Sequence, residues 1–237
     1  MAMVKPKPLV PVPSRVYSID PRRLHEMVAP YSESVSELLR EAYNRMIDDR
    51  FRLGIVFDEL AETIGVYNIY VKEIWNTSIE RIRYVRDDVF KYPDVFMHPD
   101  LTWRLGKGDC EDKTLLVISA LARLKRGNNT SEAYACLGYV KIPSGQAPGG
   151  GHAWIIYSHP RLADGTWLLI ETTLDKPLPL HKWIIHDYSL FIPVYFFDDK
   201  HTYRIDSDYD ILGLTREYVE KHRKEIDMVI EYLEPIS

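Results

Sequence analysis

The chain has 237 residues, a formal net charge of −5 at pH 7 and an isoelectric point near 5.9. This acidic balance argues against a nucleic-acid-binding protein and a polybasic membrane anchor, and no apolar run reaches the roughly 20 residues of a membrane span. The proline-rich N-terminus lacks the apolar core of a signal peptide. We therefore expect a cytoplasmic protein without nucleic-acid or membrane partners, with its two cysteines reduced. Gln146 is the only glutamine, which favours a thermophilic source.

The first part of the chain is expected to be helical. Prolines recur through residues 5–21, so residues 1–30 are predicted to form an N-terminal extended arm, followed by one domain over 31–237. Within that domain, the part over about 31–127 shows helical spacing of apolar residues. The expected helices, apart from the one that follows the cysteine, cover residues 32–49, 56–76 and 78–92, the last with Thr77 or Ser78 as its N-cap.

The segment "EDKTLLVISALARLKRG" predicts a buried central helix. Asp109 is a good N-cap residue, acidic residues occupy the first turn, and basic residues occupy the last turn before Gly127. Between them almost no polar face remains. A helix that is apolar nearly all round packs in the centre of a fold.

The pattern changes after this helix. Over about 132–205, four short segments rich in β-branched and aromatic residues are separated by glycine, proline, aspartate and asparagine: "EAYACLGYVKI", "GHAWIIYS", "TWLLIETTL" and "SLFIPVYFF". They predict an antiparallel sheet, and a last helix is expected over about 214–233. Helices followed by strands indicate an α+β fold in which the central helix packs on the sheet.

Cys110, in "GKGDCEDKT", is a candidate nucleophile. It stands at the first position of the central helix, where unpaired backbone N–H groups and the helix dipole lower a thiol pKa. The same N–H groups could bind the oxyanion of a tetrahedral intermediate. Glu111 and Asp112 would raise the thiol pKa if they faced it, but successive helical residues turn by about 100°, so we expect both to point away.

A nucleophilic cysteine needs a histidine, and the histidine needs an orienting group. Of the eight histidines, His152 begins an apolar strand directly after "SGQAPGGG", and Glu171 interrupts the next strand. A buried carboxylate needs a partner, and a histidine on the adjacent strand would provide one. Each of the three residues alone is compatible with a structural role, but their combination favours catalysis.

The three motifs in this order resemble the core of the transglutaminase-like superfamily: "GKGDC" at a helix start, "HAW" on a strand, and an acidic residue before a threonine-containing strand end, here "ETT". The resemblance implies a papain-like fold and a triad of Cys110, His152 and Glu171 that transfers acyl groups from peptide or protein amides, without a cofactor. The family's usual third member is aspartate, so Asp175 is the alternative to Glu171. Whether water or an amine resolves the thioester stays open, as does the oligomeric state.

Four further residues are supporting or cleft candidates: Trp103, Arg104, Asp109 and Trp154. No metal site is expected, because His181 and His186 lack further nearby ligands. The loop over residues 144–151 is expected to be mobile and to control access to the thiol. The alternative to an enzyme is a non-catalytic binding module that keeps the same fold.

Overall fold

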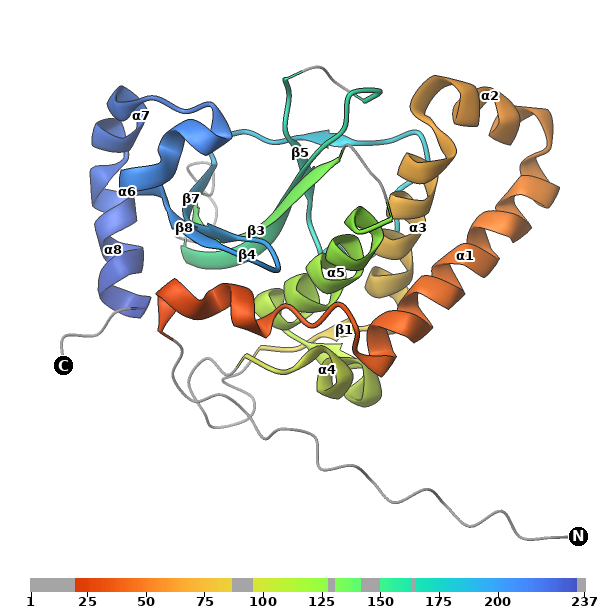
Figure 1. Cartoon of the computed structure of the whole chain (residues 1–237), viewed down its shortest axis with the longest axis horizontal. Coiled ribbons are helices and arrows are strands. Elements are labelled where there is room, and N and C mark those ends of the chain that lie inside the picture. Colours follow the sequence, from red (N-terminus) through yellow and green to blue (C-terminus); the bar gives the residue numbers. More distant parts are fainter. Residues whose placement is uncertain (1–19, 87–95, 128–130, 142–149, 163–164, 234–237) are drawn as a thin grey trace, which may run out of the picture.

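The computed structural model describes residues 20–86, 96–127, 131–141, 150–162 and 165–233. Helices of the first half pack on one side of a six-stranded sheet, and the central helix lies between them and the strands (Figure 1). This confirms the predicted α+β class, with a central helix on an antiparallel sheet and helices before it. Among the described residues, no helix is long and apolar enough to span a membrane.

The helical elements are, in chain order, η1 (Pro21–Met27), α1 (Glu33–Leu53), α2 (Ile55–Ile64), α3 (Val66–Arg81), α4 (Pro99–Leu105), α5 (Cys110–Lys125), α6 (Ile205–Asp208), η3 (Tyr209–Leu212), α7 (Arg216–Lys221) and α8 (Arg223–Leu233). The strands are β1 (Arg83–Tyr84), β2 (Lys107–Gly108), β3 (Glu132–Val140), β4 (Gly150–Ser158), β5 (Leu168–Ile170), β6 (Ile184–Ile185), β7 (Phe191–Phe197) and β8 (Thr202–Arg204).

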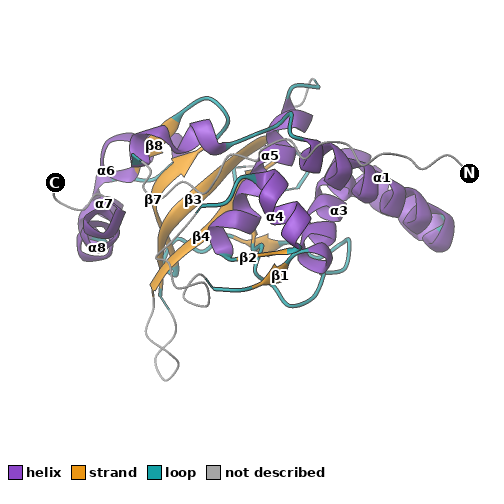
Figure 2. Ribbon diagram, turned by 90° about the horizontal axis from the view of Figure 1, so that it is seen from below, coloured by secondary structure: helices purple, strands orange, loops and turns teal. Residues whose placement is uncertain are grey.

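The main sheet has the order β6-β5-β4-β3-β7-β8, and all its pairings are antiparallel. The strands β3, β4, β5 and β7 are the four that the sequence predicts. Helices α7 and α8 lie at the β7–β8 side of the sheet (Figure 2). Strands β1 and β2 form a separate parallel pair that lies directly before α5.

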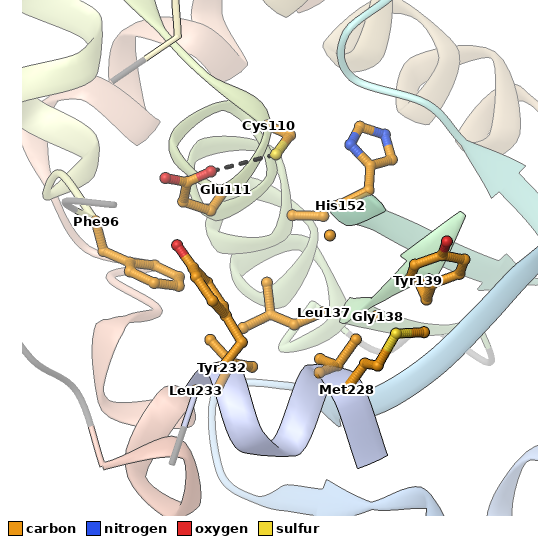
Figure 3. Close-up of a pocket in the computed structure, with 13 residues that line it drawn as sticks. Phe96, Cys110, Glu111, Leu137, Gly138, Tyr139, His152, Met228, Tyr232 and Leu233 are labelled. Carbon is orange, nitrogen blue, oxygen red and sulfur yellow. Dashed lines mark hydrogen bonds between the residues drawn. The ribbon is translucent and has the colours of Figure 1, made fainter. Parts of the chain in front are cut away.

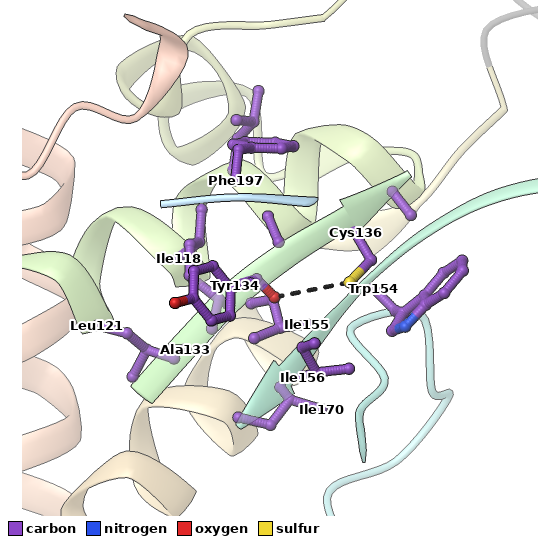
Figure 4. Close-up of a cluster of buried hydrophobic side chains, with 14 of the residues drawn as sticks. Ile118, Leu121, Ala133, Tyr134, Cys136, Trp154, Ile155, Ile156, Ile170 and Phe197 are labelled. Carbon is purple, nitrogen blue, oxygen red and sulfur yellow. Dashed lines mark hydrogen bonds between the residues drawn. The ribbon is translucent and has the colours of Figure 1, made fainter. Parts of the chain in front are cut away.

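One continuous core joins the helices to the sheet. It is built from buried aliphatic and aromatic side chains of α1, α3, α5, the sheet and α8. Its centre lies where α5 covers β3 and β4; for example, Ile118 and Leu121 on the helix pack near Ile155 on the sheet (Figure 4). This packing fixes the start of α5 against the strands that carry the candidate site.

Asp112 holds the first turn of α5 to its surroundings. Its Oδ2 accepts a hydrogen bond from the backbone N–H of Asp109 at 3.4 Å, in a capping-box arrangement. Its Oδ1 accepts one from the backbone N–H of Met97 at 2.6 Å. The acidic residues therefore build the helix start, as the sequence predicts for Asp109.

Several predicted boundaries are wrong. The helix expected over 78–92 does not begin at Thr77 or Ser78: α3 continues to Arg81, with Ser78 Oγ donating to the carbonyl of Trp75, and residues 83–84 pair as a strand with β2. Residues 56–76 form two helices because Gly65 takes a left-handed conformation (φ +87°) between them.

The two chain ends also differ from the prediction. Residues 1–19 of the predicted arm lie outside the described residues, but the 3₁₀ helix η1 folds onto the core and buries Leu24. The predicted C-terminal helix is divided into α7 and α8 at His222. Of the predicted gating loop, residues 144–149 lie outside the described residues, and Gly150 and Gly151 belong to β4.

Candidate active site

Cys110, His152 and Glu171 come from three elements that meet at one end of the sheet. Cys110 opens α5, His152 is the third residue of β4, and Glu171 directly follows β5. Cys110 and His152 line the same cavity of about 420 Å³, whose far wall is α8 (Figure 3). The cavity is therefore the candidate active-site cleft.

Glu171 and His152 are joined by a hydrogen bond. Glu171 Oε2 lies 2.9 Å from His152 Nε2. The other carboxylate oxygen, Oε1, accepts hydrogen bonds from the backbone N–H of Thr173 at 2.9 Å and from its hydroxyl at 2.6 Å. Both oxygens are thus held, and the carboxylate has one orientation, aimed at the imidazole.

The backbone around Glu171 is fixed as well. Trp75 Nε1 on α3 donates to the carbonyl oxygen of Glu171 at 2.8 Å. The hydroxyls of Thr172 and Thr114 are hydrogen-bonded at 3.2 Å, which ties the end of β5 to α5. The carboxylate is therefore positioned by both helices that pack against this end of the sheet.

These contacts determine the charge of Glu171 and the tautomer of His152. Burial alone raises the pKa of Glu171, but the hydrogen bonds from His152 and Thr173 outweigh it and leave the pKa below its ordinary value. An ionised carboxylate is only an acceptor, so Nε2 of His152 carries a proton. In the neutral imidazole, Nδ1 is then the basic nitrogen.

Cys110 differs from the expectation in its hydrogen bonds. Its thiol donates to Glu111 Oε2 at 3.3 Å, so Glu111 faces the sulfur instead of pointing away. Among the hydrogen bonds of the described residues, none joins Cys110 to His152. The backbone N–H of Ala153 is directed at the sulfur, which places Sγ beside the strand residue that follows His152.

The thiol pKa also differs from the expectation. Burial, followed by the charges of Glu111 and Asp109, raises the pKa of Cys110 well above its ordinary value, and the N–H of Ala153 opposes this only in part. The direction of this shift is opposite to the lowering that the helix N-terminus predicts, because desolvation and two carboxylates raise the thiol pKa. The resting thiol is protonated.

Three carboxylates gather beside the cysteine. Asp109, Glu111 and Asp112 are all buried, and one oxygen of each lies within 4.8 Å of the others. Burial and the neighbouring Asp109 raise the pKa of Glu111 well above its ordinary value. Carboxylate oxygens are the ligands of hard cations such as Ca²⁺, which takes six to eight oxygens, so these residues would supply part of a coordination shell.

Trp154 supports His152. Their rings are stacked with centroids 6.1 Å apart and planes 24° apart, and Trp154 is fully buried. On its other side, Trp154 Nε1 donates to His186 Nε2 at 3.0 Å. His186 is therefore a structural partner of Trp154 in the core.

Two predicted cleft residues lie elsewhere. Trp103 is buried against α1, where its Nε1 donates to Glu37 Oε2 at 2.5 Å, and Arg104 is exposed. Neither is among the described residues that line the cleft. The reason is that α4 presents its buried face to α1 and α5 and not to the sheet. Asp175 has no hydrogen bond to His152 among those of the described residues.

Sequence reasoning missed three groups at this site. Lys113 is buried on α5 and donates from Nζ to the carbonyl of Ile82 at 2.8 Å, and burial lowers its pKa to about 8. Trp75 and Thr173 hold Glu171, as described above. Thr173 could have been found, because a threonine two residues after a carboxylate commonly caps it in a local turn; Trp75 carried no such signal.

No protein-family model and no curated protein matches this chain. Among solved structures, the chain is similar to Legionella pneumophila LapG, with 15% identity and a TM-score of 0.41 over 79% of this chain and 96% of that one. EGTA-treated Legionella pneumophila LapG matches with 15% identity and a TM-score of 0.40, over the same shares. Similarity at this level does not establish a shared activity.

Proposed function

We propose that this protein is a thiol-dependent acyl-transfer enzyme of the transglutaminase-like type that acts on amide bonds of peptides or proteins. Cys110 is the nucleophile, His152 the general base and acid, and Glu171 the group that orients the imidazole. The observation that supports this most is the carboxylate of Glu171, held by Thr173 and aimed at Nε2 of a histidine that shares a cleft with a cysteine. In a catalytic triad the orienting group is hydrogen-bonded to the base, and the base shares the active site with the nucleophile.

The reaction proceeds through a thioester. The Cys110 thiol gives its proton to Nδ1 of His152 as Sγ bonds to the amide carbon, and the backbone N–H of Cys110 stabilises the oxyanion. The C–N bond then breaks, and the imidazolium returns the proton to the leaving nitrogen. Water or a primary amine attacks the thioester, His152 accepts its proton, and the thiol is regenerated with release of an acid or a new amide.

The resting thiol must change partners before this can happen. In the structure it donates to Glu111, and its pKa is raised, so the proton moves to His152 only when substrate binding turns the side chain. Apo active sites often show such loose contacts. The cysteine is thus protected from side reactions until a substrate is present.

The test is mass spectrometry of a peptide and protein mixture incubated with the protein, with and without a primary amine. We expect hydrolysed or amine-linked products from the wild type and none from Cys110→Ala. Glu171→Gln should lose about 100-fold or more in kcat/KM, because general-base function depends on the oriented imidazole. Asp175→Asn is the matched control and should stay within about threefold of the wild type. A larger loss for Asp175→Asn would transfer the orienting role to that residue.

One observation favours the alternative, a non-catalytic binding module with this fold: the raised thiol pKa and the Glu111 contact are unusual for a reactive cysteine. Alkylation separates the two functions. An enzyme should be labelled at Cys110 faster than at the fully buried Cys136 once a substrate-like amide reagent is bound. Slow labelling of both cysteines, together with no amide product, would support the binding module.

A further inference from the structure

The wall of the cleft opposite the sheet is formed by α8. Four of its residues, Met228, Val229, Tyr232 and Leu233, line the cavity that contains Cys110 and His152. Along the chain, successive members of this set are one, three and one positions apart, and this spacing places all four on one side of a helix. The polar residues of α8 that alternate with them, such as Asp227 and Glu231, line a neighbouring surface hollow, and Met228 lies at the border between that hollow and the cleft.

Two of these side chains are large, apolar and exposed. Met228 is 40% exposed and Tyr232 is 62% exposed, whereas Val229 is 7% exposed. Val229 and the fully buried Ile226 therefore anchor α8 to the core, and Met228 and Tyr232 remain free to contact a ligand. Exposed apolar side chains gathered at a cleft are typical of a binding site.

The rest of the cleft continues this apolar surface. Phe96 and Leu137 line it together with α8, and Figure 3 shows Tyr232 extending from α8 towards Glu111 beside the ring of Phe96. The space beside Gly151, on the opposite side, is open, because a Cβ there would meet no atom of the described residues within 4 Å. The volume of about 420 Å³ lies at the lower end of the range for ligand sites, which suits one or two side chains.

The charges in the cleft exclude two classes of substrate side chain. Among the described residues that line it, none is lysine or arginine, so an acidic side chain would find no permanently charged partner there. The carboxyl group of Glu111 accepts the hydrogen bond of the thiol, so a basic side chain would have to compete with Cys110 for it. An apolar side chain needs neither partner and gains free energy from leaving water.

We propose that Met228 and Tyr232 of α8, with Phe96, form the subsite that binds a large aromatic or aliphatic side chain of the substrate beside the carbonyl group attacked by Cys110. This inference rests on the proposed function and specifies its substrate class: amides flanked by a bulky apolar residue. Met228 and Tyr232 are specificity-determining residues in this assignment, and they take no part in proton transfer.

Peptidyl chloromethyl ketones test the subsite without requiring turnover. In this reaction Sγ of Cys110 forms a bond to the methylene carbon, the C–Cl bond breaks and chloride leaves with the thiol proton passing to solvent. A series that differs only in its last residue, Phe, Leu, Asp or Lys, is compared by the rate of Cys110 labelling in intact-mass spectra. Chloroacetamide, which has no side chain, measures the reactivity of the thiol itself.

Relative to chloroacetamide, we expect the Phe and Leu reagents to label Cys110 about tenfold or more faster than the Asp and Lys reagents. Equal relative rates across the series, or no labelling of Cys110 by any peptidyl reagent, would overturn the subsite.

Substitutions of opposite charge at Met228 then distinguish a change in substrate specificity from a general disruption of the cleft. Met228→Lys should speed labelling by the Asp reagent, and Met228→Glu should speed labelling by the Lys reagent, while both should slow the Phe and Leu reagents. Because Met228 is partly exposed, either side chain can reach solvent in the folded protein. Glu231→Gln, on the same helix but away from the cleft, is the control and should match the wild type. Identical effects of both Met228 substitutions on all reagents would contradict the assignment.

The outcomes also distinguish this inference from the proposed function. Selective labelling by the apolar reagents without Cys110-dependent conversion of any amide would support the subsite and refute the enzyme. Amide conversion that is indifferent to the flanking residue would support the enzyme and refute the subsite.

Discussion

Burial shifts the pKa values of several side chains far from their ordinary values. Lys72 is fully buried, its Nζ lies 3.8 Å from the centre of the Trp75 ring, and burial lowers its pKa to about 7. His186 is 6% exposed, and burial lowers its pKa to about 3. In both residues the loss of hydration by the charged form outweighs the attraction of the neighbouring carboxylate, Glu73 for Lys72 and Asp187 for His186. These groups make the stability of the protein depend on pH.

We expect His186 to destabilise the protein as pH falls. The folded state keeps it neutral down to about pH 3, whereas the unfolded chain protonates it near pH 6.5. Between these values the unfolded state binds more protons, so the free energy of unfolding decreases with decreasing pH, by up to about 1.4 kcal/mol per pH unit from this residue. Urea denaturation of the wild type and His186→Asn at pH 7.5, 6 and 5 measures the effect. The wild type should lose more stability than the variant, in which asparagine keeps an acceptor for Trp154.

His201→Asn is the control, because the side chain of His201 is 62% exposed. Its pH dependence should follow that of the wild type. If His186→Asn also follows the wild type, the neutral buried histidine is not the source of the effect.

At the scale of the elements, Gly138 determines how three strands meet. It pairs with His152 on β4, and the register between β3 and β7 shifts between Leu137 and Gly138. A Cβ at this position would overlap the carbonyl oxygen of Ile192 and approach Trp154 Cη2 to 2.7 Å. The absence of a side chain therefore allows β7 and Trp154 to approach the backbone of β3, and Trp154 in turn supports His152.

Gly138→Ala should destabilise the protein by about 1–3 kcal/mol, the range for overpacking a filled interior. It should also slow labelling of Cys110 by the Phe chloromethyl ketone, because the displaced Trp154 moves the cleft wall at His152. Gly150→Ala is the matched control: a Cβ there meets no atom of the described part of the chain within 4 Å, so its free energy of unfolding should stay within about 0.5 kcal/mol of the wild type. Equal stabilities of both variants in chemical denaturation would show that β3 and β7 can separate without loss.

Prediction from the sequence worked best for long elements. The helix that begins at Cys110 and the strands β3, β4, β5 and β7 follow from capping residues and from runs of β-branched and aromatic residues, which are local signals. The short strands β6 and β8 were missed because two or three residues show no periodicity, whereas the equally short β5 lies within the longer apolar run "TWLLI". The helix expected over 78–92 failed because the apolar spacing at residues 82–85 fits a helix equally well, and only the pairing of β1 with β2 decides against it.

At the scale of the whole molecule, helices and sheet share one core. Buried residues of α1, α3 and α5 and of the sheet belong to a single cluster, and α5 lies at its centre. A smaller cluster around Phe57 stabilises the α1–α2 end. An arrangement of this kind leaves neither half with a complete core of its own.

We expect one cooperative unfolding transition. Tryptophan fluorescence and far-ultraviolet circular dichroism should give the same midpoint in urea. Leu116→Ala, at a fully buried position of α5, should lower the free energy of unfolding by about 2–5 kcal/mol and shift both signals together. Leu105→Ala, at a position that is 44% exposed, is the control, with a change of about 0.5 kcal/mol or less. Two separate midpoints would mean that the helices and the sheet unfold as independent units.

The sequence by itself determined where α5 begins, which segments form strands and which residues could act together, because capping and side-chain periodicity depend on neighbours within a turn or a strand. It also placed Glu171 beside His152, since β4, which carries His152, and β5, which Glu171 directly follows, are adjacent along the chain. The tertiary structure decided the rest. The tryptophan that holds Glu171 from 96 residues away and the helix that closes the cleft depend on how distant segments pack, and local signals do not encode the direction of a side chain across such a contact.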